Sequence, residues 1–177
     1  MTPPEPDRSD LPSAELPGDP SLADRLRQRL IRNLDAVALH REHRPPLYDA
    51  MSGSVSAGTA AHKLGAGYDV LAPGQRACPY HFHHAQEELF VVLEGEGSLR
   101  VAGEFLPLRA GDVIFIPPGP DHPHQIINTS GAPMRYLSIS TQERPEVCEY
   151  PDSAKISVSG RGVHRQADAV DYWEAEP

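Results

Sequence analysis

Cysteine is scarce in this sequence. Its 177 residues include only two cysteines, Cys78 and Cys148, and neither has a partner at CxxC spacing. Disulfide frameworks and thiolate zinc knuckles need cysteines in sets, so the composition predicts neither. We expect both side chains to be reduced thiols in a reducing compartment, with Cys78 a small buried hydrophobe rather than a metal ligand.

Clusters of basic residues are missing as well. The formal net charge is −9 and the sequence pI is about 5.4, and no run of lysine or arginine interrupts this acidic balance. Such a chain is poorly suited to nucleic acid or to an anionic membrane surface. A small neutral or polar molecule is the partner that the composition favours.

Long apolar runs are also absent. No segment approaches the roughly 20 apolar residues that a membrane-spanning helix needs. The acidic, proline-rich start lacks the basic and apolar regions of a signal peptide. The sequence therefore predicts a cytoplasmic protein without a membrane partner.

The first 60 residues divide into two parts. Residues 1–20 contain six prolines among acidic and small polar residues, which predicts a disordered tail. Ser21 and Asp24 then have the spacing of a capping box, and leucine recurs every four residues at Leu22, Leu26, Leu30 and Leu34. We expect residues 21–60 to form a short amphipathic helix, packed on the domain or on a partner subunit, and an extended arm.

The middle of the chain predicts short strands separated by Gly/Pro turns, with residues 61–141 as one β-barrel. Arg44, Pro45 and Pro46 end any earlier element, and residues 52–61 predict a Gly/Ser/Ala-rich loop. Eight strands at this spacing indicate an all-β sandwich or barrel. We expect residues 142–177 to form a C-terminal extension that packs on the barrel, with a last helical turn over 167–173. The predicted strands are 61–71, 78–83, 88–94, 98–101, 104–108, 112–116, 124–128 and 135–141.

A first motif carries metal-ligand chemistry. The segment from Cys78 reads CPYHFHHAQEELF, and the two-residue strand period places His81 and His83 on one face while His84 points to the other. Glu88 begins the next apolar strand. Two imidazoles and a carboxylate suit Mn, Fe, Co, Ni or Zn better than Ca or Mg. A fourth ligand must come from elsewhere in the chain.

A second motif supplies a candidate for that ligand. Residues 111–128 read GDVIFIPPGPDHPHQIIN, a strand, a rigid proline turn and a second histidine-bearing strand. His124 begins this strand and could lie across a barrel from the first motif. His122 has the same strand parity, so parity cannot choose between the two histidines.

Together the two motifs resemble those of the cupin superfamily. The resemblance is close from Gly74 to Asn128, where the string HQIIN favours His124 and strict counting favours His122. The family spacing to Gly95 selects Glu88 over Glu87, which would point away from the site. The resemblance implies a single jelly-roll β-barrel with one divalent transition metal, Zn, Mn, Fe or Ni, held by His81, His83, Glu88 and His124. By analogy it also implies a homodimer.

The resemblance leaves the reaction open. It implies a metal-dependent enzyme acting on a sugar derivative, an organic acid or a phenolic compound by isomerase- or dioxygenase-type chemistry. The alternative is a non-catalytic module that binds a sugar-like small molecule. Catalysis needs a proton-transfer group beyond the ligands, and the candidates are Tyr68, Tyr80, Tyr136 and Lys63. Gln125 and Asn128 could orient a ligand or could make strand-end hydrogen bonds.

Overall fold

The computed structural model describes residues 19–177, and its regular structure is almost entirely β. The tail predicted to be disordered over residues 1–20 falls, up to residue 18, outside the described residues. One α-helix precedes the strands, and three short 3-10 helices lie at Leu34–Ala36, Pro151–Ser153 and Gln166–Asp168. The elements are α1 (Leu22–Leu30), β1 (His40–Arg44), β2 (Tyr48–Ser54), β3 (Leu64–Leu71), β4 (Phe82–His83), β5 (Glu88–Glu94), β6 (Glu96–Val101), β7 (Glu104–Arg109), β8 (Val113–Ile116), β9 (His124–Ile127), β10 (Met134–Thr141), β11 (Val147–Tyr150), β12 (Lys155–Val158) and β13 (Gly162–Arg165).

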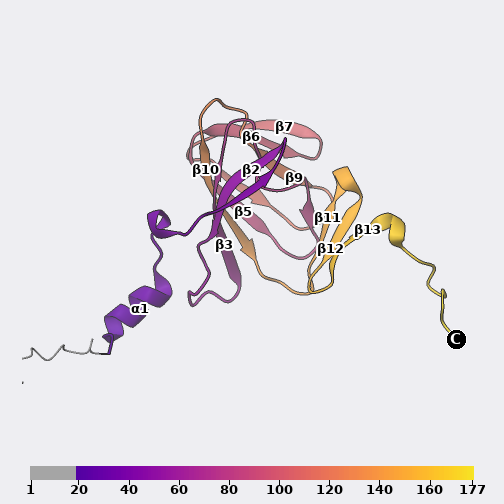
Figure 1. Ribbon diagram of the computed structural model, residues 1–177, viewed down its shortest axis with the longest axis horizontal. Helices are drawn as coiled ribbons and strands as arrows, with labels where there is room; N and C mark the ends of the chain where they lie inside the picture. Colours follow the sequence, from indigo (N-terminus) through magenta and orange to yellow (C-terminus); the bar gives the residue numbers. More distant parts are fainter. Residues whose placement is uncertain (1–18) are drawn as a thin grey trace, which may run out of the picture.

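The strands form three antiparallel sheets that enclose one core (Figure 1). The largest has the order β1-β2-β3-β10-β5-β8, and the other two have the orders β13-β12-β11-β4 and β7-β6-β9. The two smaller sheets are joined where His81 pairs with His124: the backbone N–H of each residue donates to the carbonyl of the other, at 3.1 and 2.8 Å. They therefore act as one layer facing the six-stranded sheet, and the prediction of an all-β jelly roll with a short N-terminal helix is confirmed.

The core lies between these two layers. Side chains from both layers meet there, including Leu71 and Val92 of the six-stranded sheet and Ile126 of β9, which are 0%, 1% and 4% exposed. Asn128 is fully buried at the end of β9, where its Nδ2 donates to the carbonyls of Leu71 and Ala132 at 3.0 and 2.8 Å. Its Oδ1 accepts from the Ser130 backbone. Asn128 thus organises the turn after β9, as the strand-end alternative predicted.

The turn between β5 and β6 requires the last glycine of the first motif, Gly95. Gly95 joins β5 to β6 with φ +84°, a conformation that side chains rarely adopt. A Cβ atom at this position would also lie 2.6 Å from the carbonyl oxygen of Pro133. Both the backbone conformation and the close approach therefore require glycine.

Strand predictions were most accurate near the motifs. The predicted range of β5 agrees with the structure, and β6, β7, β8, β9 and β10 differ by one or two residues at an end. β4 is shorter than predicted, although His81 continues it as an isolated bridge. The hairpin β1-β2 and the strands β11, β12 and β13 were not predicted. The five residues of β1 are all exposed, and β2 falls partly in the predicted loop.

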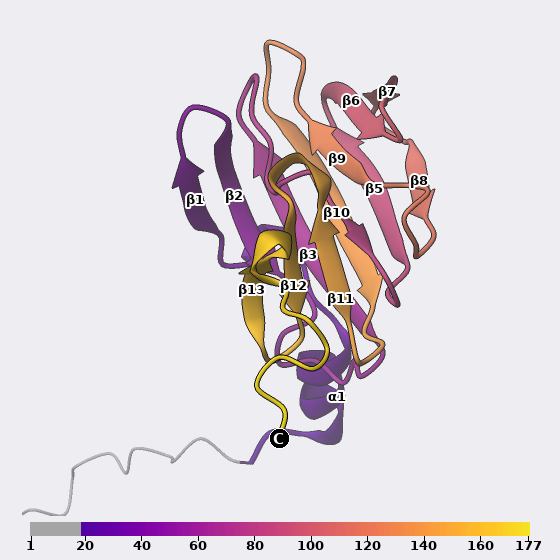
Figure 2. The same cartoon turned by 90° about the vertical axis from the view of Figure 1, so that its right-hand side faces the viewer.

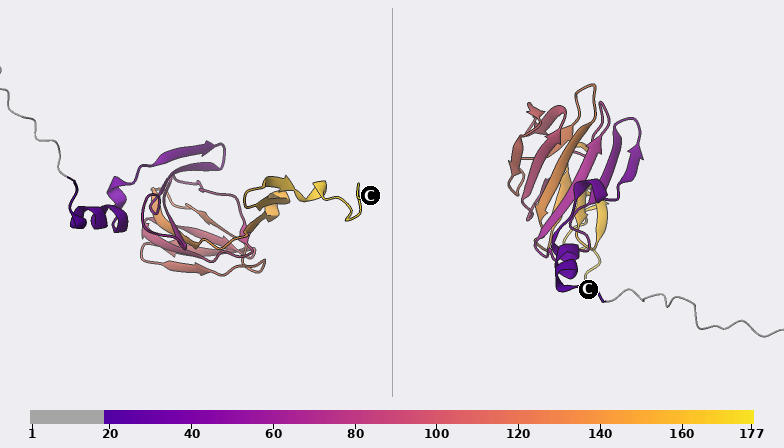
Figure 3. Two further views of the ribbon diagram at one scale, coloured as in Figure 1. Left: turned by 90° about the horizontal axis from the view of Figure 1, so that it is seen from below. Right: turned by 90° about the vertical axis from the view of Figure 1, so that its left-hand side faces the viewer.

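The N-terminal helix begins as predicted and ends earlier. Ser21 and Asp24 form the capping box, but the helix stops at Leu30 and Leu34 starts a separate 3-10 helix. None of its residues is buried, and Leu22, Leu26 and Leu30 are 64%, 48% and 63% exposed. Figure 3 shows α1 and the C-terminal segment at opposite sides of the barrel. The packing of this helix and the homodimer therefore stay predictions.

The C-terminal strands extend the smaller layer. β11 pairs with β4, so that Cys148 lies opposite His83, and β12 and β13 follow in a meander (Figure 2). The helical turn predicted over 167–173 is instead a 3-10 helix at Gln166–Asp168. Among residues 19–177, no helix has the length and apolar character needed to cross a bilayer.

Candidate metal centre

Three imidazoles converge on one carboxylate oxygen inside the barrel. Glu88 is the first residue of β5, His81 and His83 come from the segment of β4, and His124 is the first residue of β9. The Nε2 atoms lie 3.8, 3.5 and 2.8 Å from Glu88 Oε2, for His81, His83 and His124 respectively. The structure thus brings together the four side chains singled out from the two motifs, while His122 is exposed.

The other ring nitrogen of each histidine faces an acceptor. His81 Nδ1 lies 2.8 Å from the carbonyl oxygen of Pro79, and His124 Nδ1 lies 3.3 Å from that of His122. His83 Nδ1 lies 3.2 Å from Glu146 Oε1. Because a carbonyl oxygen can only accept, we assign the proton of His81 and of His124 to Nδ1, and the carboxylate favours the same for His83. The Nε2 atoms then face Glu88.

Burial controls the charge of this cluster. Burial, with a smaller effect of His124, lowers the pKa of His81 to about 4, so its ring is neutral at neutral pH. Burial acts to raise the pKa of Glu88, but the neighbouring His124, His83 and His81 outweigh it and hold that pKa below its usual value. The cluster is therefore a carboxylate facing neutral imidazole at His81.

Two atoms of the cluster are buried without a hydrogen-bond partner among the described residues. They are Glu88 Oε2 and His124 Nε2. Although these atoms lie 2.8 Å apart, their geometry is not that of a hydrogen bond. Buried polar atoms are rarely left unpaired, and a cation bound by both atoms would satisfy the nitrogen and the oxygen together. The donor set of imidazole nitrogens and one carboxylate fits a divalent transition ion.

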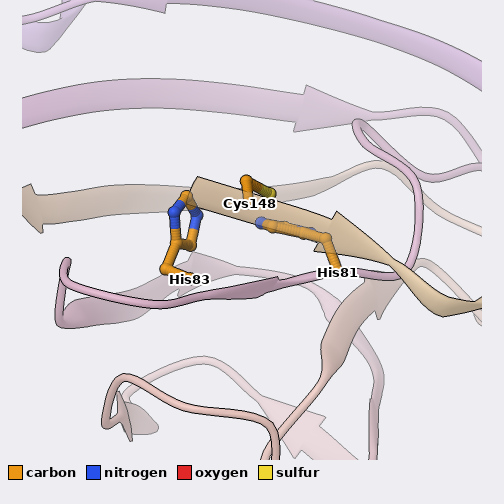
Figure 4. A group of neighbouring side chains, drawn as sticks. All are labelled: His81, His83 and Cys148. Carbon is orange, nitrogen blue, oxygen red and sulfur yellow. The ribbon is translucent and has the colours of Figure 1, made fainter. Parts of the chain in front are cut away.

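A thiol lies on the far side of the two first-motif histidines. The ligand atoms of His81, Glu88 and His124 all lie within 4.8 Å of one another, and so do those of His81, His83 and Cys148. Figure 4 shows His81 and His83 directed toward Cys148. Burial raises the pKa of Cys148 to about 11, which keeps it a thiol at neutral pH. No local sequence pattern indicates this neighbour, because the pairing of β11 with β4 joins segments far apart in the chain.

Glu146 is a second residue that sequence reasoning missed. Its carboxylate is 6% exposed and accepts from the backbone N–H groups of His84, Ala85 and Gln86 at 3.1, 3.2 and 2.9 Å. The same group lies beside His83 Nδ1. Glu146 therefore fixes both the loop after β4 and the orientation of the His83 ring.

The remaining candidates lie away from the cluster. His84 contacts Glu149 at 2.8 Å on the outer face, and Glu87 is exposed, both as predicted. Tyr80 lies under the Arg100 guanidinium, 3.8 Å from its ring centre, and Lys63 is exposed. Tyr136 is part of the core, and Gln125 Nε2 donates to the Cys78 carbonyl at 2.7 Å.

Tyr68 was a candidate proton-transfer group inside the barrel. It instead lies on the outer face of β3, in a pocket that it shares with Leu34, Val37 and Arg135. The hydroxyl accepts from Arg135 at 3.4 Å. The N-terminal arm covers this face, so Tyr68 is unavailable to a ligand inside the barrel.

Two cavities adjoin the cluster. The first, which we call the serine cleft, has a volume of about 530 Å³ and is lined by Glu88 together with Ser52, Asp69, Ser138, Ser140 and Gln142, among others. The second has a volume of about 330 Å³ and is lined by His81, His83, Cys148, Glu146 and Tyr150, among others. A small molecule can therefore approach the cluster from two sides.

Asp69 is the buried acid of the serine cleft. It is 9% exposed, and its two oxygens accept from Ser52 Oγ at 2.6 Å and from Ser138 Oγ at 3.1 Å. Burial raises its pKa above the usual value, and the two serine hydroxyls only partly offset that effect.

The fold and the site define a jelly-roll barrel protein with a buried histidine and carboxylate cluster. Residues 67–140 match the family model Cupin_2, described as the cupin domain. Residues 67–140 are thus a cupin domain, in agreement with the resemblance of the two motifs.

Three similar proteins illustrate the range within this fold. A solved structure provisionally named a sugar phosphate isomerase, from Acidithiobacillus ferrooxidans, has a TM-score of 0.72 at 22% identity over 82% of this chain and 97% of its own. An oxalate-binding protein of Thermotoga maritima is 33% identical over 69 residues, which are 39% of this chain and 54% of that protein. An uncharacterised protein of Methanocaldococcus jannaschii is 37% identical over 60 residues, 34% of this chain and 46% of its own. The chain spans about half the length of these two curated relatives, and the structural likeness shows the fold alone.

The raised pKa of Asp69 predicts a pH-dependent effect of Asp69→Asn. A carboxyl whose pKa is higher in the folded state stabilises the fold when protonated, and this contribution is lost as pH rises through the folded pKa. Asparagine does not ionise. We therefore expect the free energy of unfolding of Asp69→Asn, relative to the native protein, to increase between about pH 4 and about pH 8 in urea titrations.

Asp152→Asn is the matched control. Its hydrogen bonds to Arg100 lower the pKa of this exposed carboxyl, so its contribution has the opposite sign and is lost as pH falls. The same measurement should show a small decrease for Asp152→Asn over the same range. Parallel trends for the two variants would contradict the assignment for Asp69.

Proposed function

We propose that His81, His83, Glu88 and His124 hold one divalent transition-metal ion, and that the chain is a metal-dependent enzyme acting on a small polar molecule. The observation that carries this proposal is the set of buried, unpaired atoms that face one another at Glu88 Oε2 and His124 Nε2. Zn, Mn, Fe and Ni all accept such a set, so the ligands leave the identity of the ion to its availability. When bound, the ion would supply a Lewis acid that polarises a carbonyl or hydroxyl group.

The chain itself offers proton donors beside the ligands. Tyr150 and Cys148 line the second cavity with His81 and His83. Burial raises the pKa of Tyr150 to about 12 and that of Cys148 to about 11, so both groups keep their protons at neutral pH. They could donate hydrogen bonds to an oxygen of a bound molecule, which suits isomerase-type chemistry on a carbonyl compound.

The alternative is a non-catalytic module that captures a small molecule through the same ion. One observation favours it. Glu146 is the only carboxylate that lines the second cavity, and its oxygens already serve three backbone N–H groups and His83. A free base is therefore missing from the side chains that line this cavity.

The ligand assignment predicts metal content. Native protein should hold about one transition-metal equivalent per chain by inductively coupled plasma mass spectrometry, and His83→Ala should lose it, because few protein sites keep such an ion with a ligand removed. His84→Ala is the matched control, since this neighbouring ring faces outward to Glu149. Full metal retention in His83→Ala would refute the assignment. Separate His122→Ala and His124→Ala variants decide the second motif, and only His124→Ala should lose the metal.

Glu146 should tune the affinity for metal without contacting the ion. Glu146→Gln places an amide where His83 Nδ1 and three backbone N–H groups need an acceptor, so we expect metal affinity to fall by about 10- to 100-fold in chelator competition. Glu149→Gln, three residues further along on β11, should leave the affinity unchanged. Equal affinities for the native protein and Glu146→Gln would show that the orientation of His83 does not depend on this carboxylate.

Catalysis is distinguished from binding by proton exchange. Metal-loaded protein is incubated in D₂O with aldoses and ketoses and with their phosphate esters, and the products are followed by proton NMR. An isomerase-type enzyme removes a proton from the carbon next to the carbonyl and returns a deuteron there, so the corresponding signal should disappear. Binding of a sugar without any exchange would favour the non-catalytic alternative.

A further inference from the structure

The serine cleft contains polar groups that the metal centre does not use. Its walls come from β2, β3 and β10, and Glu88 at one end connects it to the ligand cluster. Its volume of about 530 Å³ is in the range of small-molecule sites. The cleft therefore offers space for the part of a molecule that extends beyond the ion.

Strand register aligns the hydroxyl groups with Glu88. Ser140 pairs with Glu88 on one side and with Gly65 on the other, and two residues further along β10 Ser138 pairs with Gly67. Asp69 follows in the next row, opposite Ser52. Alternate residues of a strand share a face, so these side chains point into the same cavity. Asp69 and Ser140 are separated by four residues along β10, or roughly 13 Å, which suits an elongated ligand.

Two glycines of β3 keep the cleft open. A Cβ atom at Gly67 would lie 2.6 Å from Ser138 Oγ, and one at Gly65 would lie 2.5 Å from Gln142 Nε2. Neither glycine has a positive φ, so the backbone conformation does not require them. Their role is to leave room beside the serine hydroxyl groups.

The hydrogen bonds already present leave acceptors free. Ser52 and Ser138 donate their hydroxyl protons to Asp69, so the lone pairs of both serine oxygens remain available. Ser140 Oγ accepts from Gln142 Nε2 and keeps its own proton for donation. Ligand hydroxyl groups both donate and accept, whereas a phosphate or carboxylate can only accept. The hydrogen-bond acceptors and the donor that remain free in the cleft therefore match the hydroxyl groups of a ligand.

The charge of the residues that line the cleft also favours a ligand without anionic groups. The residues that line the serine cleft include two carboxyl groups, Asp69 and Glu88, but no lysine or arginine. Of these lining side chains only His40 could become positively charged, and it lies on the exposed strand β1. Phosphate and carboxylate sites normally contain arginine, lysine or backbone N–H groups at a helix N-terminus. An anionic group placed in the cleft would meet carboxyl groups without such compensation.

We propose that the serine cleft binds an uncharged, polyhydroxylated molecule, a sugar or polyol without phosphate or carboxylate, whose other end lies at the metal centre. This inference rests on the proposed function and specifies its substrate class. It separates this chain from the sugar phosphate and oxalate named for the similar proteins, whose ligands are anionic.

Matched sugar pairs test the proposal by calorimetry on metal-loaded protein. The probes are ribose with ribose 5-phosphate, fructose with fructose 6-phosphate and mannose with mannose 6-phosphate, with oxalate as a separate anion. In each pair that binds, the uncharged sugar should bind at least about tenfold more tightly, because the phosphate meets no cation in the cleft. Tighter binding of the phosphate ester, or no uncharged sugar with a dissociation constant below about 10 mM, would overturn the proposal.

Variants locate the binding site. Ser138→Ala should weaken binding of the uncharged sugar by about tenfold, the usual effect of one lost hydrogen bond to a ligand. Ser157→Ala is the matched control, because Ser157 lines the second cavity. Weakening by Ser157→Ala with no effect of Ser138→Ala would place the ligand in the wrong cavity and overturn the proposal. Unchanged metal content in Ser138→Ala verifies that the variant is folded.

Measuring the metal content of the native protein shows which of the two proposals has failed, the assignment of the cleft or the proposed function. If the native protein binds metal and prefers the phosphate esters, only the assignment of the cleft is wrong. If the native protein binds no metal, the proposed function is wrong. In that event calorimetry on the metal-free protein still decides the cleft, since sugar binding lost in Ser138→Ala supports it and no binding overturns it.

Discussion

The pair of backbone hydrogen bonds between His81 and His124 is the constraint on which the rest of the structure depends. These bonds join the sheets β13-β12-β11-β4 and β7-β6-β9 into one layer and so close the barrel. The residues that make them also carry two of the imidazoles that face Glu88. The backbone pairing that closes the barrel therefore also brings these side chains together, and neither motif forms the site alone.

The side chains that line the interior of the barrel change from apolar at one end to polar at the other. The ring of His124 lies 5.6 Å from that of Phe90, at the edge of the apolar core. On the other side of Glu88, serine hydroxyl groups and glycines replace this apolar wall. The converging imidazole nitrogens and carboxylate oxygen thus lie where a dry environment strengthens electrostatic interactions while a polar cavity still gives access to them. A single sheet supplies both environments because the inward positions of β10 change from Tyr136 to Ser138 and Ser140.

Local sequence patterns predicted those strands and turns whose structure depends on residues close by in the chain. The apolar run after Glu88 and the glycine turn at Gly95 determine β5. The two motifs named the four side chains that converge, although the choice of His124 over His122 needed the family string HQIIN, because strict counting favoured His122. β2 was missed because Ser52 and Ser54 on its inner face line a cavity, which removes the apolar alternation of a core strand. Glu146 and Cys148 could not be predicted, because only the pairing of β11 with β4 brings them beside His83. The early end of the helix, before Leu34, likewise reflects the course of the N-terminal arm over β3 rather than the leucine spacing.

The position of Glu146 also determines how much of the chain makes a working unit. The family domain ends at residue 140, yet the carboxylate that holds the loop after β4 lies beyond that boundary. A fragment cut at the family boundary would contain all four converging side chains and lack the group that orients one of them. The unit that keeps the orientation of His83 is therefore larger than the family domain, and a graft of the barrel into another protein would have to include Glu146 and the strand β11 that follows it.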